Sequence, residues 1–241
     1  MGAGRERIMA DPFELEERIL YMDNHLIIVN KLPGELVQSD DTGDRTLGDE
    51  IKDYLKAKFA KPGNVFLGVV HRLDRPTSGA VIYARTDKAL SRMNGLFKTS
   101  AVGKTYWAAV DNLPPQEEGV LVNEIVRDSK KNKSFVVRSK VQGSQNARLS
   151  YKVLGSSKSF HLLEIELETG RHHQIRAQLA AIGIHIKGDL KYGFPRSDPD
   201  GGIHLHSRKI EFEHPVSHEH IVAIARPPKD PVWDYFAANF C

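Results

Sequence analysis

The chain has one cysteine among its 241 residues, and that cysteine, Cys241, is the last residue. A single thiol cannot form a disulfide within the chain, nor can it supply the several thiolates of a zinc or iron–sulfur cluster. Long apolar runs are also missing, and the charged N-terminus has no apolar signal core. We therefore expect a cytoplasmic protein that does not enter a membrane.

A strong excess of one charge is also absent, because 34 Lys and Arg residues stand against 31 Asp and Glu residues. The net charge of +3 permits binding to nucleic acid without requiring it. With 40% hydrophobic and 27% charged residues, the composition is that of an ordinary globular protein, and no linker divides the chain. We expect a flexible lead-in over residues 1–17 and one folded domain over residues 18–241.

One stretch organises the rest of the chain, residues 66–85, FLGVVHRLDRPTSGAVIYAR. Residues 66–70 and 80–84 are rich in Val and Ile and predict two buried strands, so the loop 71–79 emerges between rigid elements with Asp74 at its centre. The Asp74 carboxylate could simply hydrogen-bond the backbone of its own turn. A kinase-type H-R-D loop is the other interpretation from the residues alone. It fits poorly, because the sequence has no Gly-rich phosphate loop, D-F-G or G-K-[ST] motif.

The remaining pattern predicts an α+β fold with a mixed, mostly antiparallel sheet and a few flanking helices. We expect helices over 47–59 and 87–98, capped by Thr46 and Thr86, and a helix over 172–182 that ends at Gly183. In the last of these, Ile175, Leu179 and Ile182 should form the buried stripe. The expected strands are 19–21, 26–29, 104–110, an antiparallel meander within 119–167, and 203–213 with 221–225.

Two clusters of side chains are open to more than one interpretation. The segment 127–140 carries six basic residues against one Asp, among them Lys130, Lys131 and Lys133. Such a run is either a solvated hairpin tip or a contact for phosphates. Histidines gather at 204, 206, 214, 218 and 220, but Pro215 interrupts helical spacing there and no carboxylate–His helix motif is present, so we expect no metal site.

Several motifs occur in a fixed order along the chain. They are H-R-L-D-R-P-T-S-G at 71–79, K-T-Y at 104–106, E-T-G-R-H-H-Q-I-R at 168–176, G-D-L-K-Y-G at 188–193 and L-H-S-R-K-I-E-F-E-H-P at 205–215. Over about residues 18–226 the chain resembles the RluA family of RNA pseudouridine synthases. One departure is Ser207, where these proteins more often have Ala.

The resemblance implies the pseudouridine synthase catalytic fold with a central cleft, and isomerisation of specific uridines in rRNA or tRNA without a cofactor. Larger family members carry an N-terminal S4 RNA-binding domain. We expect this chain to lack one and to act as a monomer. A protein of the same fold that binds RNA but has lost turnover is the alternative, and a His-dependent metal hydrolase is a weaker one.

The resemblance also implies roles for single residues. Asp74 is expected to work at C1′ and C2′ of the nucleotide, either as nucleophile or as base, and Arg176 to supply the cation that keeps it ionised. Tyr106 is expected to stack on the base and to take part in removing the C5 proton. Arg72 is expected to fill the stack that a flipped uridine leaves. Further substrate contacts are expected from His71, Thr77, Arg171, His173 and Gln174.

The basic run gives the first testable prediction. If Lys130, Lys131 and Lys133 meet RNA phosphates, changing all three to Ala should weaken RNA binding and flatten the salt dependence of the affinity. The expected reduction in slope is about 2, since each phosphate of a single-stranded substrate contributes about 0.7. Turnover at saturating RNA should survive. Affinity for RNA measured across a salt series tests this. If wild type and variant show the same salt dependence, the basic run is only a solvated hairpin tip.

Overall fold

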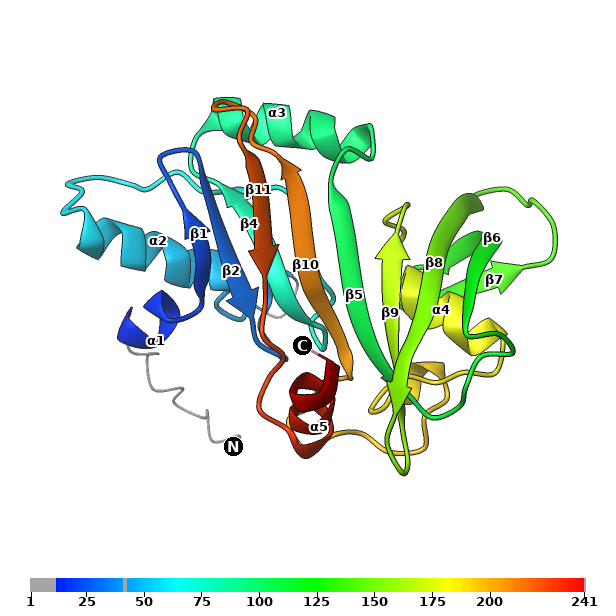
Figure 1. Cartoon of the computed structure of the whole chain (residues 1–241). Helices are drawn as coiled ribbons and strands as arrows, with labels where there is room; N and C mark the ends of the chain where they lie inside the picture. Colours follow the sequence, from blue (N-terminus) through cyan, green and yellow to red (C-terminus); the bar gives the residue numbers. More distant parts are fainter. Residues whose placement is uncertain (1–11, 41–42, 241) are drawn as a thin grey trace, which may run out of the picture.

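The computed structural model describes residues 12–40 and 43–240, and its centre is an 11-stranded sheet (Figure 1). The strand order is β1-β2-β4-β10-β5-β9-β8-β6-β7, with β11 beside β10 and β3 beside β4. The pairing of β4 with β10 is parallel, and the other pairings are antiparallel. The predicted α+β fold with a mixed, mostly antiparallel sheet is therefore confirmed.

The strands are β1 (Ile19–Met22), β2 (Leu26–Lys31), β3 (Gly68–Val69), β4 (Ser78–Ala84), β5 (Gly103–Val110), β6 (Glu118–Asp128), β7 (Lys133–Val137), β8 (Gln145–Ser156), β9 (His161–Leu167), β10 (Leu205–Glu213) and β11 (His220–Ile224). The helices are α1 (Pro12–Glu16), α2 (Leu47–Lys58), α3 (Asp87–Lys98), α4 (Gln174–Ala181) and α5 (Pro231–Phe240), with a single 3₁₀ turn, η1 (Leu190–Tyr192).

Both faces of the sheet are covered, as the two-residue period of its strands requires. On β2, Ile27 and Val29 pack in the cluster that α2 and α4 complete, whereas Leu26 and Ile28 pack in the cluster that α3 completes. Near β5 the aromatic side chains of α5 close the second face. Burying each such aliphatic side chain fully contributes about 1.5–3 kcal/mol, so the apolar residues on both faces of β2 favour helices on both sides of the sheet.

The predicted helix starts at Thr46 and Thr86 are confirmed. The Thr46 hydroxyl accepts the backbone N–H of Asp49 at 3.1 Å, and the Asp49 carboxylate reaches back to the backbone N–H of Thr46 at 3.2 Å, which completes a capping box. The Thr86 hydroxyl accepts the backbone N–H of Ala89 at 3.2 Å. Each cap satisfies donors that the first turn of a helix leaves free.

Some predicted boundaries are wrong. The helix expected over 172–182 begins at Gln174, because His173 lies in the left-handed region with a φ of 53° and cannot continue a right-handed helix. Ile182 follows the last helical turn and is 39% exposed, so it does not extend the buried stripe of Ile175 and Leu179. The strand expected over 66–70 is reduced to β3.

The segment 119–167 differs in arrangement from the expected meander. The strands within 119–167 are antiparallel, but β7 lies at the sheet edge while β8 pairs with β6 and β9, so they do not form a meander in chain order. The aromatic C-terminal segment forms α5 with Trp233 and Phe236 buried. Of the expected lead-in, residues 1–11 lie outside the described residues, as does Cys241, whereas Leu15 in α1 is buried.

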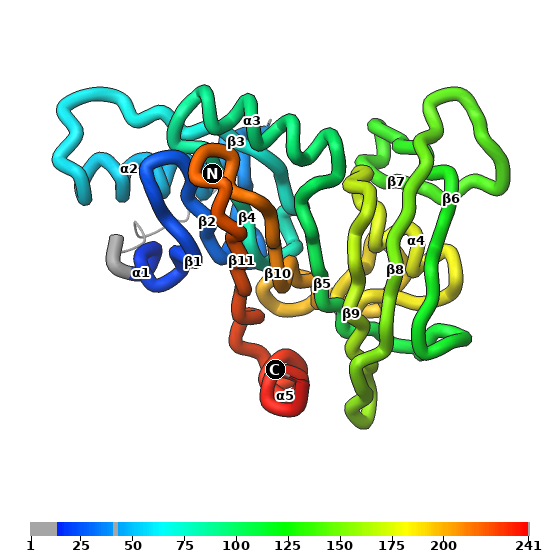
Figure 2. The backbone as a smooth tube through the Cα atoms, turned by 45° about the horizontal axis from the view of Figure 1, so that its top comes forward, coloured from blue at the N-terminus to red at the C-terminus, as the bar shows by residue number. Residues whose placement is uncertain are grey.

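Figure 2 shows the sheet in two halves. One half holds β1, β2, β4, β10, β11 and β5, and the other holds β9, β8, β6 and β7 with α4 behind them. At Gly79, the first half packs so tightly that an added Cβ would lie 2.4 Å from the backbone oxygen of Ser207 on β10. Gly79 also has a φ of 114°, which disfavours any other residue. Among the described helices, none has the length and apolar character needed to cross a membrane.

Candidate active site

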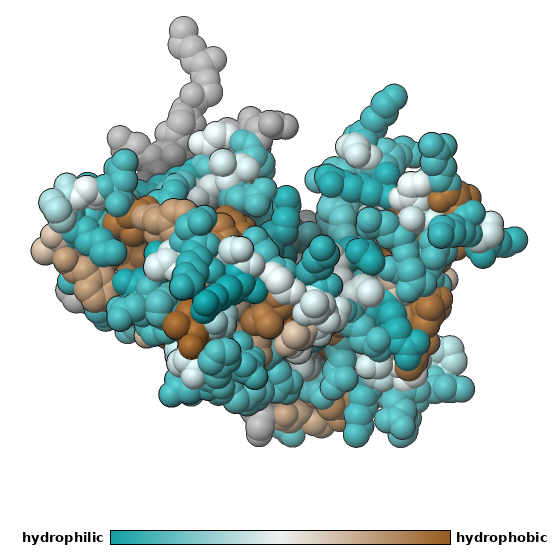
Figure 3. Space-filling view, turned by 90° about the horizontal axis from the view of Figure 1, so that it is seen from above, coloured by the Kyte–Doolittle hydropathy of each residue, from teal (hydrophilic) through white to brown (hydrophobic). Residues whose placement is uncertain are grey.

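One cleft of about 570 Å³ is lined by three segments of the chain and by Leu205 at the start of β10. Its walls are the loop that precedes β4, the segment from the end of α3 into β5, and the segment from the end of β9 into α4. Seen from above, the molecule has two lobes with a hydrophilic recess between them (Figure 3). The cleft lining includes nine residues that the sequence predicted for the site: His71, Arg72, Asp74, Thr77, Tyr106, Arg171, His173, Gln174 and Arg176.

The Asp74 carboxylate points into this cleft and does not bond its own turn. The turn is closed by backbone atoms, with the Thr77 N–H donating to the Asp74 carbonyl at 3.0 Å. Arg176 Nη1 donates to Asp74 Oδ2 at 2.9 Å, and His173 Nε2 lies 3.4 Å from the same oxygen. The Asp74 side chain is 24% exposed. Within the described part of the chain its second oxygen, Oδ1, has no hydrogen-bond partner, and that oxygen is left for a ligand.

Arg176 is held between two carboxylates. Its Nε and Nη2 donate to the two oxygens of Asp189 at 2.7 and 2.8 Å, which leaves Nη1 for Asp74. Arg176 is 5% exposed and the Asp189 side chain 1% exposed. Burial lowers the pKa of Arg176, but the hydrogen bonds and charge of Asp189, together with Asp74, outweigh burial and raise it. The expected contact between Arg176 and Asp74 is therefore present, and a second, bidentate pair fixes the guanidinium in place.

A fully buried lysine supports the loop that carries Asp74 from behind. Lys31, the last residue of β2, donates through Nζ to the carbonyls of Leu32, Arg75 and Thr77 at 3.0, 3.0 and 2.6 Å. Burial lowers the pKa of Lys31 to about 7. Three carbonyl acceptors nevertheless use all three hydrogens of an ammonium group. Two of these carbonyls lie within three residues after Asp74, so Lys31 fixes the backbone on which the Asp74 side chain depends.

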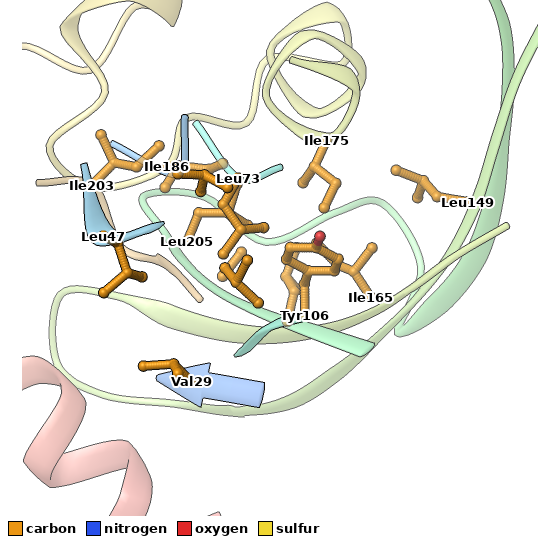
Figure 4. Close-up of a cluster of buried hydrophobic side chains, with 14 of the residues drawn as sticks. Val29, Leu47, Leu73, Tyr106, Leu149, Ile165, Ile175, Ile186, Ile203 and Leu205 are labelled. Carbon is orange, nitrogen blue, oxygen red and sulfur yellow. The ribbon is translucent and has the colours of Figure 1, made fainter. Parts of the chain in front are cut away.

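Tyr106 lies in the main hydrophobic cluster with its ring among Leu205, Ile165 and Ile175 (Figure 4). Tyr106 is 7% exposed and lines the cleft. Burial raises the pKa of the Tyr106 hydroxyl to about 12, with a further increase from the charge of Asp74. The hydroxyl of Ser207, opposite Tyr106 in the β5–β10 pairing, acts in the other direction. The departure noted at Ser207 thus places a second hydroxyl beside the tyrosine of the cleft.

A chain of contacts connects the cleft to the basic hairpin of β6 and β7. His173 Nδ1 lies 3.0 Å from the Tyr192 hydroxyl, and that hydroxyl accepts the backbone N–H of Ser134 on β7 at 2.8 Å. The ring of His172 stacks on His173 with centroids 3.8 Å apart, and His172 Nδ1 lies 2.9 Å from the Ser134 hydroxyl. Burial lowers the pKa of His173 to about 3, so its imidazole is neutral beside Asp74.

The other side chains predicted to contact the substrate differ in whether the protein already uses their hydrogen-bonding groups. The Gln174 amide bonds Thr169 and the backbone of Arg148 and Arg171, so it positions the loop before α4. His71 accepts the backbone N–H of Ile82, and its ring is therefore also held by the protein. By contrast, the Thr77 hydroxyl is buried without a hydrogen-bond partner in the described structure, although it lines the cleft.

The charged residues expected to meet RNA fall into two places. Arg72 is exposed at the cleft, whereas Lys130 and Lys131 lie at the turn between β6 and β7, and Lys133 begins β7. The cleft lining, over the described residues, contains none of these three lysines. Lys133 Nζ lies 4.7 Å from the centre of the Tyr192 ring, and Asn132 Oδ1 lies 3.2 Å from His172 Nε2, so the hairpin contacts the residues beside the cleft at more than one point.

The histidines near the C-terminus are used by the fold. His204 contacts the carboxylates of Asp198 and Asp230, both at 2.8 Å, and Asp230 in turn bonds the first turn of α5. His206 lies 2.9 Å from the hydroxyl of Ser78. Within residues 12–40 and 43–240, no group of three or more His, Cys, Asp and Glu side chains is arranged to hold a metal ion.

Sequence reasoning missed several residues of the site. Asp189 lies in G-D-L-K-Y-G, a stretch whose similarity was noted without assigning the carboxylate a partner. Lys31 had a signal of its own, since a lysine stands two residues after the apolar run Leu26–Val29 that forms most of β2. Lys104 lies in K-T-Y and lines the cleft beside Tyr106. In each case the residue type was visible, but its surroundings come from distant parts of the chain.

The chain is similar in sequence to known RNA pseudouridine synthases over most of its length. Residues 25–181 match the profile of a family described as RNA pseudouridylate synthase. The chain is 33% identical over 227 residues to the uncharacterized RNA pseudouridine synthase YlyB of Bacillus subtilis, covering 92% of this chain and 72% of that protein. It is 29% identical over 230 residues to ribosomal large subunit pseudouridine synthase D of Zymomonas mobilis, covering 91% and 72%.

Among solved structures, human RNA pseudouridylate synthase domain containing 4 superposes with a TM-score of 0.76 at 26% identity, covering 92% of this chain and 93% of that one.

The doubly paired Arg176 generates a stability prediction. Changing Arg176→Met should lower the free energy of unfolding by about 3–5 kcal/mol, because it leaves the carboxylate of Asp189 buried without a cation. The double variant Arg176→Met with Asp189→Leu should recover most of that loss, since both buried charges are then gone. Denaturant unfolding of the wild type and the two variants measures both effects. Equal stability of wild type and Arg176→Met would show that Asp189 does not need the guanidinium.

Proposed function

The chain belongs to the RNA pseudouridylate synthase family, and we propose that in this enzyme Asp74 is the carboxylate that acts on the uridine nucleotide. Pseudouridine formation breaks the bond between N1 and C1′, rotates the base, and rejoins it through C5. The observation that supports Asp74 most directly is its geometry, in which Arg176 holds Oδ2 and leaves Oδ1 facing the cleft. Arg176 also supplies the opposite charge that a carboxylate needs in a partly dry site.

Asp74 Oδ1 would work in one of two ways. As a nucleophile it attacks C1′ and displaces the uracil, which later returns through C5. As a base it takes the C2′ proton and promotes the same cleavage by elimination. Both routes need an ionised oxygen at the sugar, and both end with loss of the proton from C5. The arrangement of Arg176 and Asp189 serves either route equally.

Tyr106 and Arg72 are proposed to handle the base and the gap it leaves. The Tyr106 ring would stack on the flipped uracil inside the cleft, and its hydroxyl, which burial keeps protonated with a pKa of about 12, starts the reaction as a hydrogen-bond donor. Flipping a nucleotide out of a stem or loop costs a few kcal/mol. The exposed Arg72 at the cleft mouth would offset part of that cost by filling the vacated stack.

The substrate is proposed to be a uridine in structured RNA, either rRNA or tRNA. A relative named for the large ribosomal subunit favours rRNA. We further propose that the enzyme works in the cytoplasm as a monomer, and that residues 18–241 form its catalytic domain. Pseudouridine mapping of RNA from cells with and without the protein identifies the target. An unchanged map in both rRNA and tRNA would reject this choice of substrate.

The central prediction concerns Asp74→Asn. It should abolish pseudouridine formation and leave RNA affinity within a few-fold of wild type, because it removes the ionised oxygen without changing side-chain size. Tritium release from RNA labelled at C5 of uridine measures turnover. The matched control is Asp53→Asn, which removes an exposed carboxylate on α2 outside the cleft lining and should keep full turnover. Full turnover by Asp74→Asn would reject the assignment.

A separate prediction tests the Tyr106 hydroxyl. Tyr106→Phe keeps the stacking ring, so RNA affinity should hold while turnover falls at least about a hundredfold, the scale of general acid–base groups. Because the pKa of Tyr106 is about 12, wild-type turnover should show no titration of this hydroxyl between about pH 6 and 9. A pH–rate profile of wild type and variant checks both points. Near-normal turnover in Tyr106→Phe would leave the residue only a stacking role.

A further inference from the structure

One wall of the cleft carries a lysine whose ammonium group has no hydrogen-bond or ion-pair partner among the described residues. Lys104, the second residue of β5, is half-buried and lines the cleft. Its ammonium has neither a hydrogen bond nor an ion pair with any residue in the described ranges. Burial lowers the pKa of Lys104, and its charge adds to the burial that lowers the pKa of His71 to about 3. A desolvated, unpaired ammonium at a cleft wall is costly unless a ligand brings the opposite charge.

The carboxylates of the cleft cannot fill this role. Asp74 is held by Arg176, and Glu168 is paired with Arg148 at 2.8 Å. Aromatic rings adjoin Lys104 instead. Its Nζ lies 5.7 Å from the centre of the Phe97 ring, and that ring stacks on His71 with centroids 5.0 Å apart. These rings supply favourable contact for a cation but no counter-charge.

Lys104 also lies at a suitable distance from the proposed position of the base. Lys104 and Tyr106 are two residues apart on β5, which separates them by about 6.6 Å along the strand, and both side chains line the same cleft. A nucleotide whose base rests on Tyr106 must place its own phosphate outside the ring contact. We propose that Lys104, backed by Phe97 and His71, binds an RNA phosphate next to the flipped uridine. This inference rests on the proposed function, since it assumes an RNA strand in the cleft.

The test measures binding and needs no turnover. Fluorescence anisotropy gives the affinity of wild type and Lys104→Met for labelled octauridylate across a salt series. Lys104→Met should bind about tenfold more weakly at low salt, as expected for a lost hydrogen bond to a charged group. Its salt slope should fall by about 0.7, the contribution of one phosphate in a single strand. Lys104→Arg should keep the wild-type slope.

Two controls distinguish a phosphate site from a general loss of positive charge and from a loss of folding. Lys88→Met also removes one positive charge. Lys88 is exposed at the start of α3, the end of the helix that does not line the cleft, so this variant should leave the salt slope unchanged. Thermal unfolding of Lys104→Met should show no loss of stability, because an apolar side chain replaces an unpaired, half-buried charge. The proposal would be overturned if Lys104→Met kept the wild-type salt slope, whether or not its melting temperature fell. It would also be overturned if Lys88→Met reduced the slope as much as Lys104→Met does.

The test of the Lys104 phosphate site can succeed or fail independently of the proposed catalytic role of Asp74. If Asp74→Asn were fully active and Lys104→Met still showed the smaller salt slope, the proposed role of Asp74 would fail and the phosphate site would stand. If Asp74→Asn were inactive and Lys104→Met kept its slope, only the phosphate site would fail.

Discussion

The guanidinium of Arg176, buried between Asp74 and Asp189, is the interaction on which the rest of the site depends. One cation offsets two carboxylates, and the partner that it bonds through two atoms is Asp189, which is almost completely buried. Asp74 receives the remaining nitrogen, and its second oxygen has no hydrogen-bond partner in the part of the chain that the structure describes. The two carboxylates therefore differ in what they do for the arginine: Asp189 fixes it through two hydrogen bonds, whereas Asp74, which we propose for the chemistry, receives one.

This interaction also joins parts of the fold that the sequence keeps far apart. Asp74 comes from the loop before β4, Arg176 from α4, and Asp189 from the segment before η1. α4 packs behind the half of the sheet formed by β6 to β9, whereas β4 belongs to the other half. Lys31 anchors the same loop from β2. The Asp74 carboxylate is thus positioned by both halves of the sheet, and the cleft lies where they meet.

The proposed RNA contacts reach the site by different routes. Arg72 and Lys104 line the cleft itself, while the lysines of the β6–β7 hairpin lie outside it. The hairpin is nevertheless connected to Asp74 through Ser134, Tyr192 and His173. Removing a hairpin lysine should therefore change binding without changing chemistry, whereas disturbing Tyr192 would reach the carboxylate. Positioning of the RNA and reaction at the uridine are in this way assigned to separate groups.

The sequence by itself determined the elements whose causes are local. The hydroxyls of Thr46 and Thr86 set the helix starts, and short apolar runs set the buried strands, because these depend on neighbours a few residues away. The resemblance carried by the motifs at 71–79 and 168–176 also led us to expect the contact between Asp74 and Arg176 that the structure shows. Only the tertiary structure decided that Asp189 shares that arginine, that Lys31 holds the loop, and that Lys104 has no partner among the described residues. A buried charge is tolerated according to what surrounds it, and those surroundings come from segments that meet only when the sheet is assembled.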